Sequence, residues 1–213
     1  MDYKKKIEFQ KSHFDKIAAY CRKIDIDLFS SAFDINSLNF LKQYNFKYNK
    51  VPSALITNLD FLKEIAKQRK KTFISTGMCL MKNIEKAVKI FKKAKCPFIL
   101  MHCVSQYPCP DDLLNLNIIR TFKKKFNCEI GYSGHEISVS PSFFAWMLGA
   151  NYIERHITID RTMWGTDQAS SLEQPGMRNL SSVLKRAKIF FGNGKKKFSM
   201  KEKKLFKKFK YWQ

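Results

Sequence analysis

The sequence has no closely paired cysteines and no long apolar run, and each absence excludes a class of protein. Its six cysteines stand singly, with no C-x-x-C pair, so neither a disulfide framework nor a zinc ribbon is indicated. They are predicted to be free thiols packed as small hydrophobic residues. The longest nearly uninterrupted apolar run, 97–104, is far shorter than the roughly 20 residues that span a bilayer. The opening residues, MDYKKK, form no signal peptide, which predicts a cytoplasmic protein.

Acidic residues are also scarce, because 18 Asp and Glu stand against 40 Lys and Arg, for a net charge of +22. This balance suits a protein that binds nucleic acid or an anionic membrane. It equally suits an enzyme whose substrates are phosphates and carboxylates. A hydrophobic share of 45% in 213 residues is enough for one domain with a core, and it excludes a disordered chain. Composition alone does not choose among the three kinds of partner.

Short apolar runs typical of β-strands alternate along the chain with segments typical of helices. The runs begin near Ile26, Phe46, Thr72, Pro97, Glu129 and Tyr152. Helices are predicted at 14–22, 38–44, 58–68, 82–93, 115–126 and 140–148, several of them with apolar residues at i, i+3 and i+4. A strand followed by a helix at this spacing predicts parallel βα units.

Each strand-like run ends in polar or ionisable residues, as in Ser30-Ser31 after the first and Ser133-Gly134-His135 after the fifth. Polar side chains at the carboxyl ends of parallel strands are how a (β/α) barrel builds an active site, so an α/β fold of the TIM-barrel type is predicted. An open, doubly wound sheet is the alternative architecture. A complete barrel needs about 250 residues. The chain accounts for about six of the eight βα units, and the deficit is predicted at its N-terminus.

Five motifs stand in one order along the chain: 51–58 (VPSALITN), 74–78 (ISTGM), 102–108 (HCVSQYP), 131–136 (GYSGHE) and 153–158 (IERHIT). Together with the later run 164–173 (WGTDQASSLE), they resemble the sialic acid (N-acetylneuraminate) synthase family. The resemblance implies a TIM-barrel enzyme that uses phosphoenolpyruvate. Its implied reaction joins phosphoenolpyruvate to N-acetylmannosamine or a related N-acyl hexosamine, releasing phosphate and giving an N-acetylneuraminate-type acid.

Two histidines, His135 and His156, follow consecutive predicted strands and are expected to point into the same barrel mouth. Imidazole with oxygen co-ligands suits a divalent metal, with Mn²⁺ as the first choice and Mg²⁺ as the alternative. By resemblance, the matching histidines hold a metal that polarises the sugar aldehyde for attack by the enol carbon. Both are predicted as metal ligands and catalytic residues. His102, in the body of a strand, is predicted to fill a core position instead.

Phosphoenolpyruvate carries a phosphate and a carboxylate, which need cations and fixed hydrogen-bond donors. By resemblance, Lys50 is the catalytic cation of its pocket. The serines that match the pocket are Ser31, Ser53, Ser75, Ser105 and Ser133. Tyr107 and Asp167 resemble the family's contacts to the amino-sugar, Tyr107 along its face and Asp167 at its hydroxyls.

The chain departs from the family pattern in three ways. No segment matches the family's first two strands, which supply an acidic residue, a lysine and an asparagine to the site. Leu55 stands where many members have an acid, so the exact acyl-sugar stays open. No C-terminal antifreeze-like domain follows the barrel. The isolated chain is therefore expected to be impaired, and to be completed by dimerisation or by a separate N-terminal fragment.

Two parts are predicted: a partial barrel at residues 1–193, and a basic tail at residues 194–213 with nine lysines and one glutamate. Apolar residues among the lysines are typical of an amphipathic helix on a membrane or on nucleic acid, although a solvated helix is the simpler interpretation. Nucleic acid is not expected, because no RNA-binding motif is present. Two rival hypotheses remain: a remnant barrel that has lost the reaction, and a basic module that binds polyanions.

Overall fold

Five parallel strands form the centre of the molecule in a computed structural model that describes residues 8–209 and 212. They are β1 (Tyr48–Val51), β2 (Lys71–Ser75), β3 (Phe98–Cys103), β4 (Glu129–Gly134) and β5 (Tyr152–Arg155). Each strand pairs with the one that follows it in the chain, so the order is β1-β2-β3-β4-β5 and never reverses. A doubly wound sheet would contain such a reversal. The sheet is therefore part of a barrel wall, which confirms the predicted TIM-type α/β fold class.

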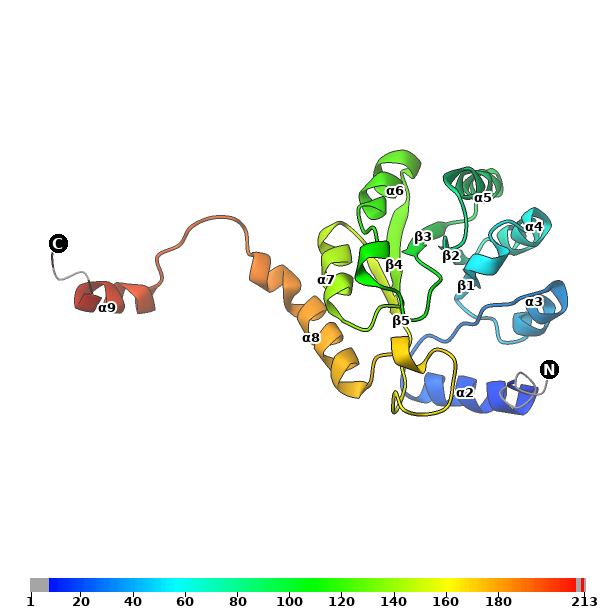
Figure 1. Cartoon of the computed structure of the whole chain (residues 1–213), viewed down its shortest axis with the longest axis horizontal. Coiled ribbons are helices and arrows are strands. Elements are labelled where there is room, and N and C mark those ends of the chain that lie inside the picture. Colours follow the sequence, from blue (N-terminus) through cyan, green and yellow to red (C-terminus); the bar gives the residue numbers. More distant parts are fainter. Residues whose placement is uncertain (1–7, 210–211, 213) are drawn as a thin grey trace.

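Helices cover the outer side of this curved sheet, as Figure 1 shows. They are α3 (Ile35–Lys42), α4 (Leu59–Lys67), α5 (Met81–Lys93), α6 (Ile118–Phe126) and α7 (Ser140–Met147). The Asn58 side chain caps α4 by accepting a hydrogen bond from the Phe61 amide at 3.1 Å. Before the sheet, α2 (Lys11–Lys23) packs on α3 through the rings of Phe14 and Phe40, 5.4 Å apart.

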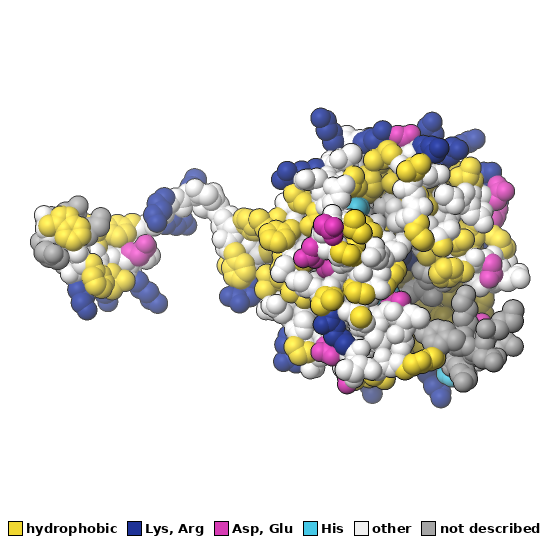
Figure 2. Space-filling view, viewed as in Figure 1, with side chains coloured by type: hydrophobic (Ala, Val, Ile, Leu, Met, Phe, Trp, Pro, Cys, Tyr) yellow, Lys and Arg dark blue, Asp and Glu magenta, His cyan; other side chains and the backbone are white. Residues whose placement is uncertain are grey.

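Two further helices follow the last strand. The first is α8 (Gln174–Phe191), which the sequence did not predict, and the second is α9 (Met200–Phe209), which lies within the predicted basic tail. Figure 1 shows α9 separated from the barrel by an extended segment, and Figure 2 shows lysines along that segment. Residues 1–7, 210, 211 and 213, which belong to the two predicted parts, lie outside the described residues. Within the described residues, no helix is long and apolar enough to cross a membrane.

The strand predicted near Ile26 is wrong. Residues 26–30 form no regular ladder, and only Ser31 makes a single parallel bridge, to Lys50. Side-chain contacts hold this segment beside β1 without strand pairing, because Phe29 stacks on Phe73 with ring centroids 5.3 Å apart and Asp27 pairs with Lys47 at 2.9 Å. The described residues thus contain five strands rather than six.

The two faces of the sheet differ because successive side chains of a strand point to opposite sides. On the outer face, Ile74, Leu100 and Ile130 are fully buried in a large apolar cluster against the helices. On the inner face, a smaller cluster is built on Phe73, Ile99 and Met101. Polar residues of the same inner rows follow towards the carboxyl ends of the strands. The barrel wall therefore has an apolar floor and a polar mouth.

The cysteines are free, as predicted, and Cys96, Cys103 and Cys109 are buried. Burial raises the pKa of both the Cys79 and the Cys128 thiol to about 11. Thiols held protonated in this way are poor nucleophiles. These two cysteines therefore act as packing residues rather than reactive groups.

Candidate active site

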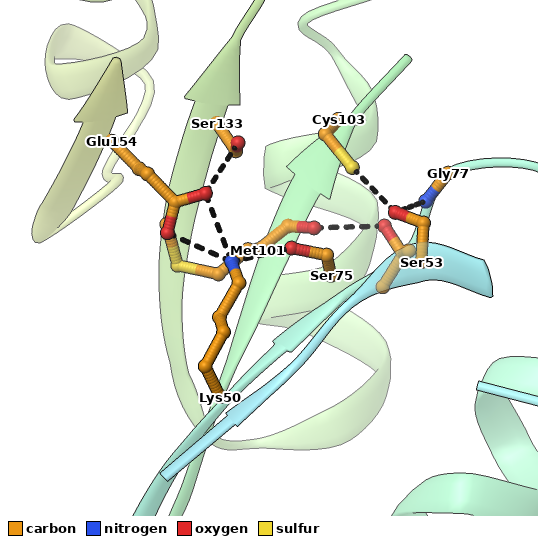
Figure 3. Close-up of polar contacts among 9 residues, drawn as sticks. Lys50, Ser53, Ser75, Gly77, Met101, Cys103, Ser133 and Glu154 are labelled. Carbon is orange, nitrogen blue, oxygen red and sulfur yellow. Dashed lines mark hydrogen bonds and ion pairs between the residues drawn. The ribbon is translucent and has the colours of Figure 1, made fainter. Parts of the chain in front are cut away.

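Lys50 lies at the centre of the polar mouth. Its ammonium group donates to Ser75 Oγ at 2.6 Å and to both carboxylate oxygens of Glu154, at 2.7 and 2.9 Å. Ser133 Oγ donates to Glu154 Oε1 at 2.8 Å, so four strands contribute one side chain each to this group (Figure 3). The register explains the meeting, since parallel strands bring their carboxyl ends to one edge. Three predicted site residues, Lys50, Ser75 and Ser133, are thereby brought together.

The charge of Glu154 is set by two opposing effects. Partial burial favours the neutral acid, but the Lys50 ammonium and the Ser133 hydroxyl outweigh it and lower the pKa of Glu154. The Lys50 side chain is only 10% exposed, whereas that of Glu154 is 39% exposed. An ionised carboxylate that solvent can reach thus lies beside a nearly buried cation.

A second group of donors surrounds Gly77, just after β2. The Gly77 amide donates to Ser53 Oγ at 3.0 Å, and Ser53 Oγ lies 3.2 Å from Cys103 Sγ (Figure 3). A Cβ atom on Gly77 would lie 2.2 Å from Ser105 Oγ and 2.9 Å from Ser53 Oγ. The two predicted serines therefore converge on a backbone position that only glycine can occupy without displacing them.

Three aromatic rings form the other side of the mouth. The ring centroids of Tyr107 and His135 are 4.1 Å apart, those of His135 and His156 are 5.3 Å apart, and those of Tyr107 and His156 are 5.6 Å apart. Burial raises the pKa of Tyr107 to about 12, so its hydroxyl stays protonated. The predicted histidine pair and the predicted sugar contact thus stand together.

The remaining predicted residues lie at the rim. Asp167 Oδ2 is 3.9 Å from His156 Nδ1, which is too long for a hydrogen bond. Ser31 is joined to Lys50 by a single backbone bridge. His102 points to the outer face, where its Nε2 lies 2.7 Å from the Leu114 carbonyl oxygen. This placement agrees with the prediction that His102 fills a core position.

The histidine pair fits a divalent metal in one specific way. His135 Nδ1 lies 2.6 Å from the Val104 carbonyl oxygen, a bond that uses the Nδ1 proton and leaves Nε2 as the ring's electron-pair donor. Burial also lowers the pKa of His135, which favours the neutral imidazole that binds metals. Within residues 8–209 and 212, no group of three His, Cys, Asp or Glu side chains is arranged to hold a metal. A metal here would take two imidazoles and complete its coordination with water and substrate oxygens.

The match to a known protein family shows to which family the chain belongs. The model of the NeuB family matches residues 1–196, which is most of the chain. The chain belongs to the NeuB family. Its NeuB-type fold and motifs therefore come from common ancestry with these proteins.

Known relatives support the same assignment. The N,N'-diacetyllegionaminic acid synthase of Campylobacter jejuni is 36% identical over 93% of this chain, and the N-acetylneuraminate-9-phosphate synthase of Drosophila melanogaster is 35% identical over 88% of it. The chain covers 60% and 51% of those two proteins. The crystal structure of the N-acetylneuraminic acid synthetase of Leptospira borgpetersenii, in complex with citrate, superposes with a TM-score of 0.84. It is 35% identical, over 94% of this chain and 70% of that chain.

Glu154 is the site residue that sequence reasoning missed. In the sequence, Glu154 stands only as part of the motif 153–158, yet it pairs with Lys50 and accepts a hydrogen bond from the Ser133 hydroxyl. A signal was present, because Glu154 stands two residues before His156 and so shares its face of the strand. An acid on the inner face of a barrel strand needs a cation opposite it.

The close approach around Gly77 leads to a testable prediction for this NeuB-family protein. The motifs imply phosphoenolpyruvate as the substrate, and Gly77→Ala is expected to raise its KM about 30-fold, because Ser53 and Ser105 must rotate away and each loses a hydrogen bond worth about 1 kcal/mol. Phosphate release at varied phosphoenolpyruvate concentration measures the change. Gly176→Ala is the matched control, since its nearest neighbour would be 3.6 Å away. An unchanged KM in Gly77→Ala would show that these serines do not contact the substrate.

Proposed function

We propose that this protein is a nonulosonic acid synthase, an enzyme that condenses phosphoenolpyruvate with N-acetylmannosamine or a related N-acyl hexosamine. The observation that carries the proposal is the placement of a nearly buried lysine and three hydroxyl donors beside a convergent histidine pair. Such a site offers a cation and donors to a phosphate and a carboxylate, and offers imidazoles to a metal. The synthase names of the relatives support the same reaction class.

The reaction forms one carbon–carbon bond and releases one phosphate. The enol carbon C3 of phosphoenolpyruvate bonds to the aldehyde carbon of the open-chain sugar, and the aldehyde oxygen takes up a proton. Water adds at C2, loses its proton, and phosphate leaves C2 as the keto acid forms. The product therefore contains the atoms of both substrates and water, less phosphate.

The residues of the mouth divide this work. Lys50 and the serines hold the phosphate and the carboxylate of phosphoenolpyruvate by charge-assisted hydrogen bonds. Glu154, kept ionised beside Lys50, can accept the proton of the attacking water. Tyr107 supplies an aromatic face next to His135 for the sugar, and Asp167 accepts hydrogen bonds from its hydroxyls. A bound Mn²⁺, or alternatively Mg²⁺, held by His135 and His156 would supply a Lewis acid to the sugar aldehyde.

The site is expected to need more of the barrel than these five strands. Among the described strands, β1 and β5 each have one strand neighbour, and beyond them lie only isolated bridges, Ser31 to Lys50 beside β1 and Ile157 to Leu172 just after β5. Exposed edges and a half-open inner face are sites for pairing with further strands. We propose that a further βαβα segment completes the wall, supplied by an N-terminal fragment or through a homodimer.

The experiment is phosphate release from phosphoenolpyruvate with Mn²⁺ and N-acetylmannosamine. It is run on this chain alone and again with a separately expressed N-terminal βαβα segment from a full-length relative. Release that needs both substrates and Mn²⁺, and that rises when the segment is added, supports the proposal. Metal binding without release in either arm, repeated with other N-acyl hexosamines, would contradict it and favour a remnant barrel.

A further inference from the structure

Behind the histidine pair, on the outer face of the sheet, lies a buried ion pair. Arg155 Nη1 is 2.9 Å from Glu136 Oε1, and both side chains are 0% exposed. The Tyr132 hydroxyl donates to the other carboxylate oxygen of Glu136 at 2.8 Å. None of these three side chains lies in the mouth, and the proposed mechanism uses none of them. Their role follows from the segments of the chain that they connect.

The Arg155 guanidinium joins β5 to the loop that follows β4 and to α7. It donates to the backbone carbonyls of Glu136 and Ser138, the latter at 2.9 Å, and to Ser142 Oγ at 3.2 Å. A planar guanidinium holds several acceptors in one fixed geometry. The two strand ends therefore cannot slide past each other without breaking several directional bonds at once.

Each member of the ion pair is the chain neighbour of a histidine, since Glu136 follows His135 and Arg155 precedes His156. Alternation along β5 places Glu154 and His156 on the inner face and Arg155 on the outer face. Fixing Arg155 against Glu136 on the outside therefore fixes where His135 and His156 stand on the inside, with their ring centroids 5.3 Å apart.

Gly134 provides the space for this arrangement. A Cβ atom at Gly134 would lie 2.6 Å from Glu136 Oε2 and 2.8 Å from Tyr132 Cε1. The Glu136 carboxylate thus folds back across the end of β4, over a residue that has no side chain. Any other residue would push the carboxylate or the tyrosine ring out of place.

Energetics favour a geometric role over a stabilising one. Burying an ion pair costs desolvation that the attraction between its charges often fails to recover, and apolar residues of similar volume frequently stabilise as well or better. Both side chains of the pair are 0% exposed, so both charges have been removed from water. A fully enclosed charged network is more useful for holding one arrangement than for adding stability.

We propose that Tyr132, Glu136 and Arg155 form a positioning clamp that sets the separation of His135 and His156, and thereby the metal site of this enzyme. The clamp residues touch neither substrate nor metal and act only through the two histidines. The metal role of the histidines rests on the proposed function, but the geometric claim does not.

The test uses Cu²⁺ as a probe, because Cu²⁺ binds imidazole more tightly than other first-row divalent ions and its electron paramagnetic resonance spectrum counts bound nitrogens. The full chain is titrated with Cu²⁺, and a His135→Ala/His156→Ala variant gives the background. The wild-type chain is expected to bind one Cu²⁺ through two histidine nitrogens. Arg155→Met/Glu136→Gln, which removes both charges together, is expected to weaken this site about tenfold or more and to leave one nitrogen.

Graded variants keep the test decisive if the double variant fails to fold. Tyr132→Phe removes one hydroxyl, and Arg155→Lys keeps the positive charge but loses the planar guanidinium with its several donors. Both variants are therefore expected to weaken Cu²⁺ binding by less than the double variant. Glu129→Gln is the matched control, because Glu129 joins Lys71 at 2.6 Å and the Tyr152 hydroxyl at 2.8 Å at the opposite ends of the same strands. It is expected to leave Cu²⁺ binding unchanged.

Two results would overturn the clamp: a wild-type chain without a two-nitrogen site, or folded clamp variants that keep both nitrogens and bind Cu²⁺ within about twofold of wild type. A purely structural role would lower the unfolding temperature and leave the nitrogen count of the folded variant intact. A chain that shows the expected Cu²⁺ results but releases no phosphate, either alone or with the N-terminal βαβα segment, would contradict the proposed function alone.

Discussion

Replacing Lys50 with methionine is expected to lower kcat/KM for phosphoenolpyruvate about 10²–10³-fold, the usual cost of removing one key donor to a charged reacting group. The variant loses the cation that contacts Ser75 at 2.6 Å and Glu154 at 2.7 Å. It also leaves the Glu154 carboxylate facing the substrate's negative charges without compensation. The measurement is phosphate release under the conditions that give activity to the wild-type protein.

A neighbouring lysine provides the control for this substitution. Lys47 stands just before β1, is 63% exposed and pairs with Asp27 on the surface, so Lys47→Met removes the same charge from the same segment outside the mouth. Its kcat/KM is expected to stay within about twofold of wild type, because exposed pairs contribute little. Equal activity in Lys50→Met and Lys47→Met would show that Lys50 does not contact the substrate.

The second large effect is expected at the histidine pair. His156→Ala is expected to weaken Mn²⁺ binding at least about tenfold and to lower phosphate release at least about a hundredfold, because a two-imidazole site becomes a one-imidazole site. Mn²⁺ binding is measured from the paramagnetic resonance signal of the free ion. Chelation with EDTA is expected to stop the wild-type reaction, and added Mn²⁺ to restore it.

The chain's other two histidines separate metal binding from folding. His13 lies on α2 and His102 lies against Leu114 on the outer face, so neither is placed to bind the metal. His13→Ala is expected to be neutral in both assays. His102→Gln is expected to lower the unfolding temperature while leaving Mn²⁺ affinity intact. Loss of Mn²⁺ binding in His102→Gln, with Mn²⁺ binding unaffected in His156→Ala, would contradict the assignment of the metal to His135 and His156.

The barrel-type fold could be predicted because its signals are local and repeat. Apolar runs that end in Ser75, Ser133 and His135 indicate the strands and the edge of the sheet at which they meet. The order of the strands follows their order in the chain, so no long-range contact has to be known to predict it. The segment near Ile26 failed because pairing is not local. Its apolar residues are satisfied by Phe29 stacking on Phe73, and the backbone ladder does not form beyond Ser31.

Within the site, the sequence predicted which residues lie in the mouth, but it did not predict which of them pair with one another. That Lys50 meets Glu154 depends on the curvature that carries β1 towards β5, which no spacing in the sequence encodes. The ion pair between Arg155 and Glu136 could not be predicted either, because nothing in the sequence distinguishes them from exposed charged residues. Helix α8 was missed since only part of its length is apolar on one face, with Leu180 and Ala187 buried.

Direct binding of phosphoenolpyruvate to this chain tests the central claim most simply. Isothermal titration calorimetry with Mn²⁺ present, with the wall completed by the N-terminal βαβα segment and without it, is predicted to show one saturable site. That site should be lost in Lys50→Met and kept in Lys47→Met. Binding that is equal in all three proteins, or absent with and without the segment, would contradict the account.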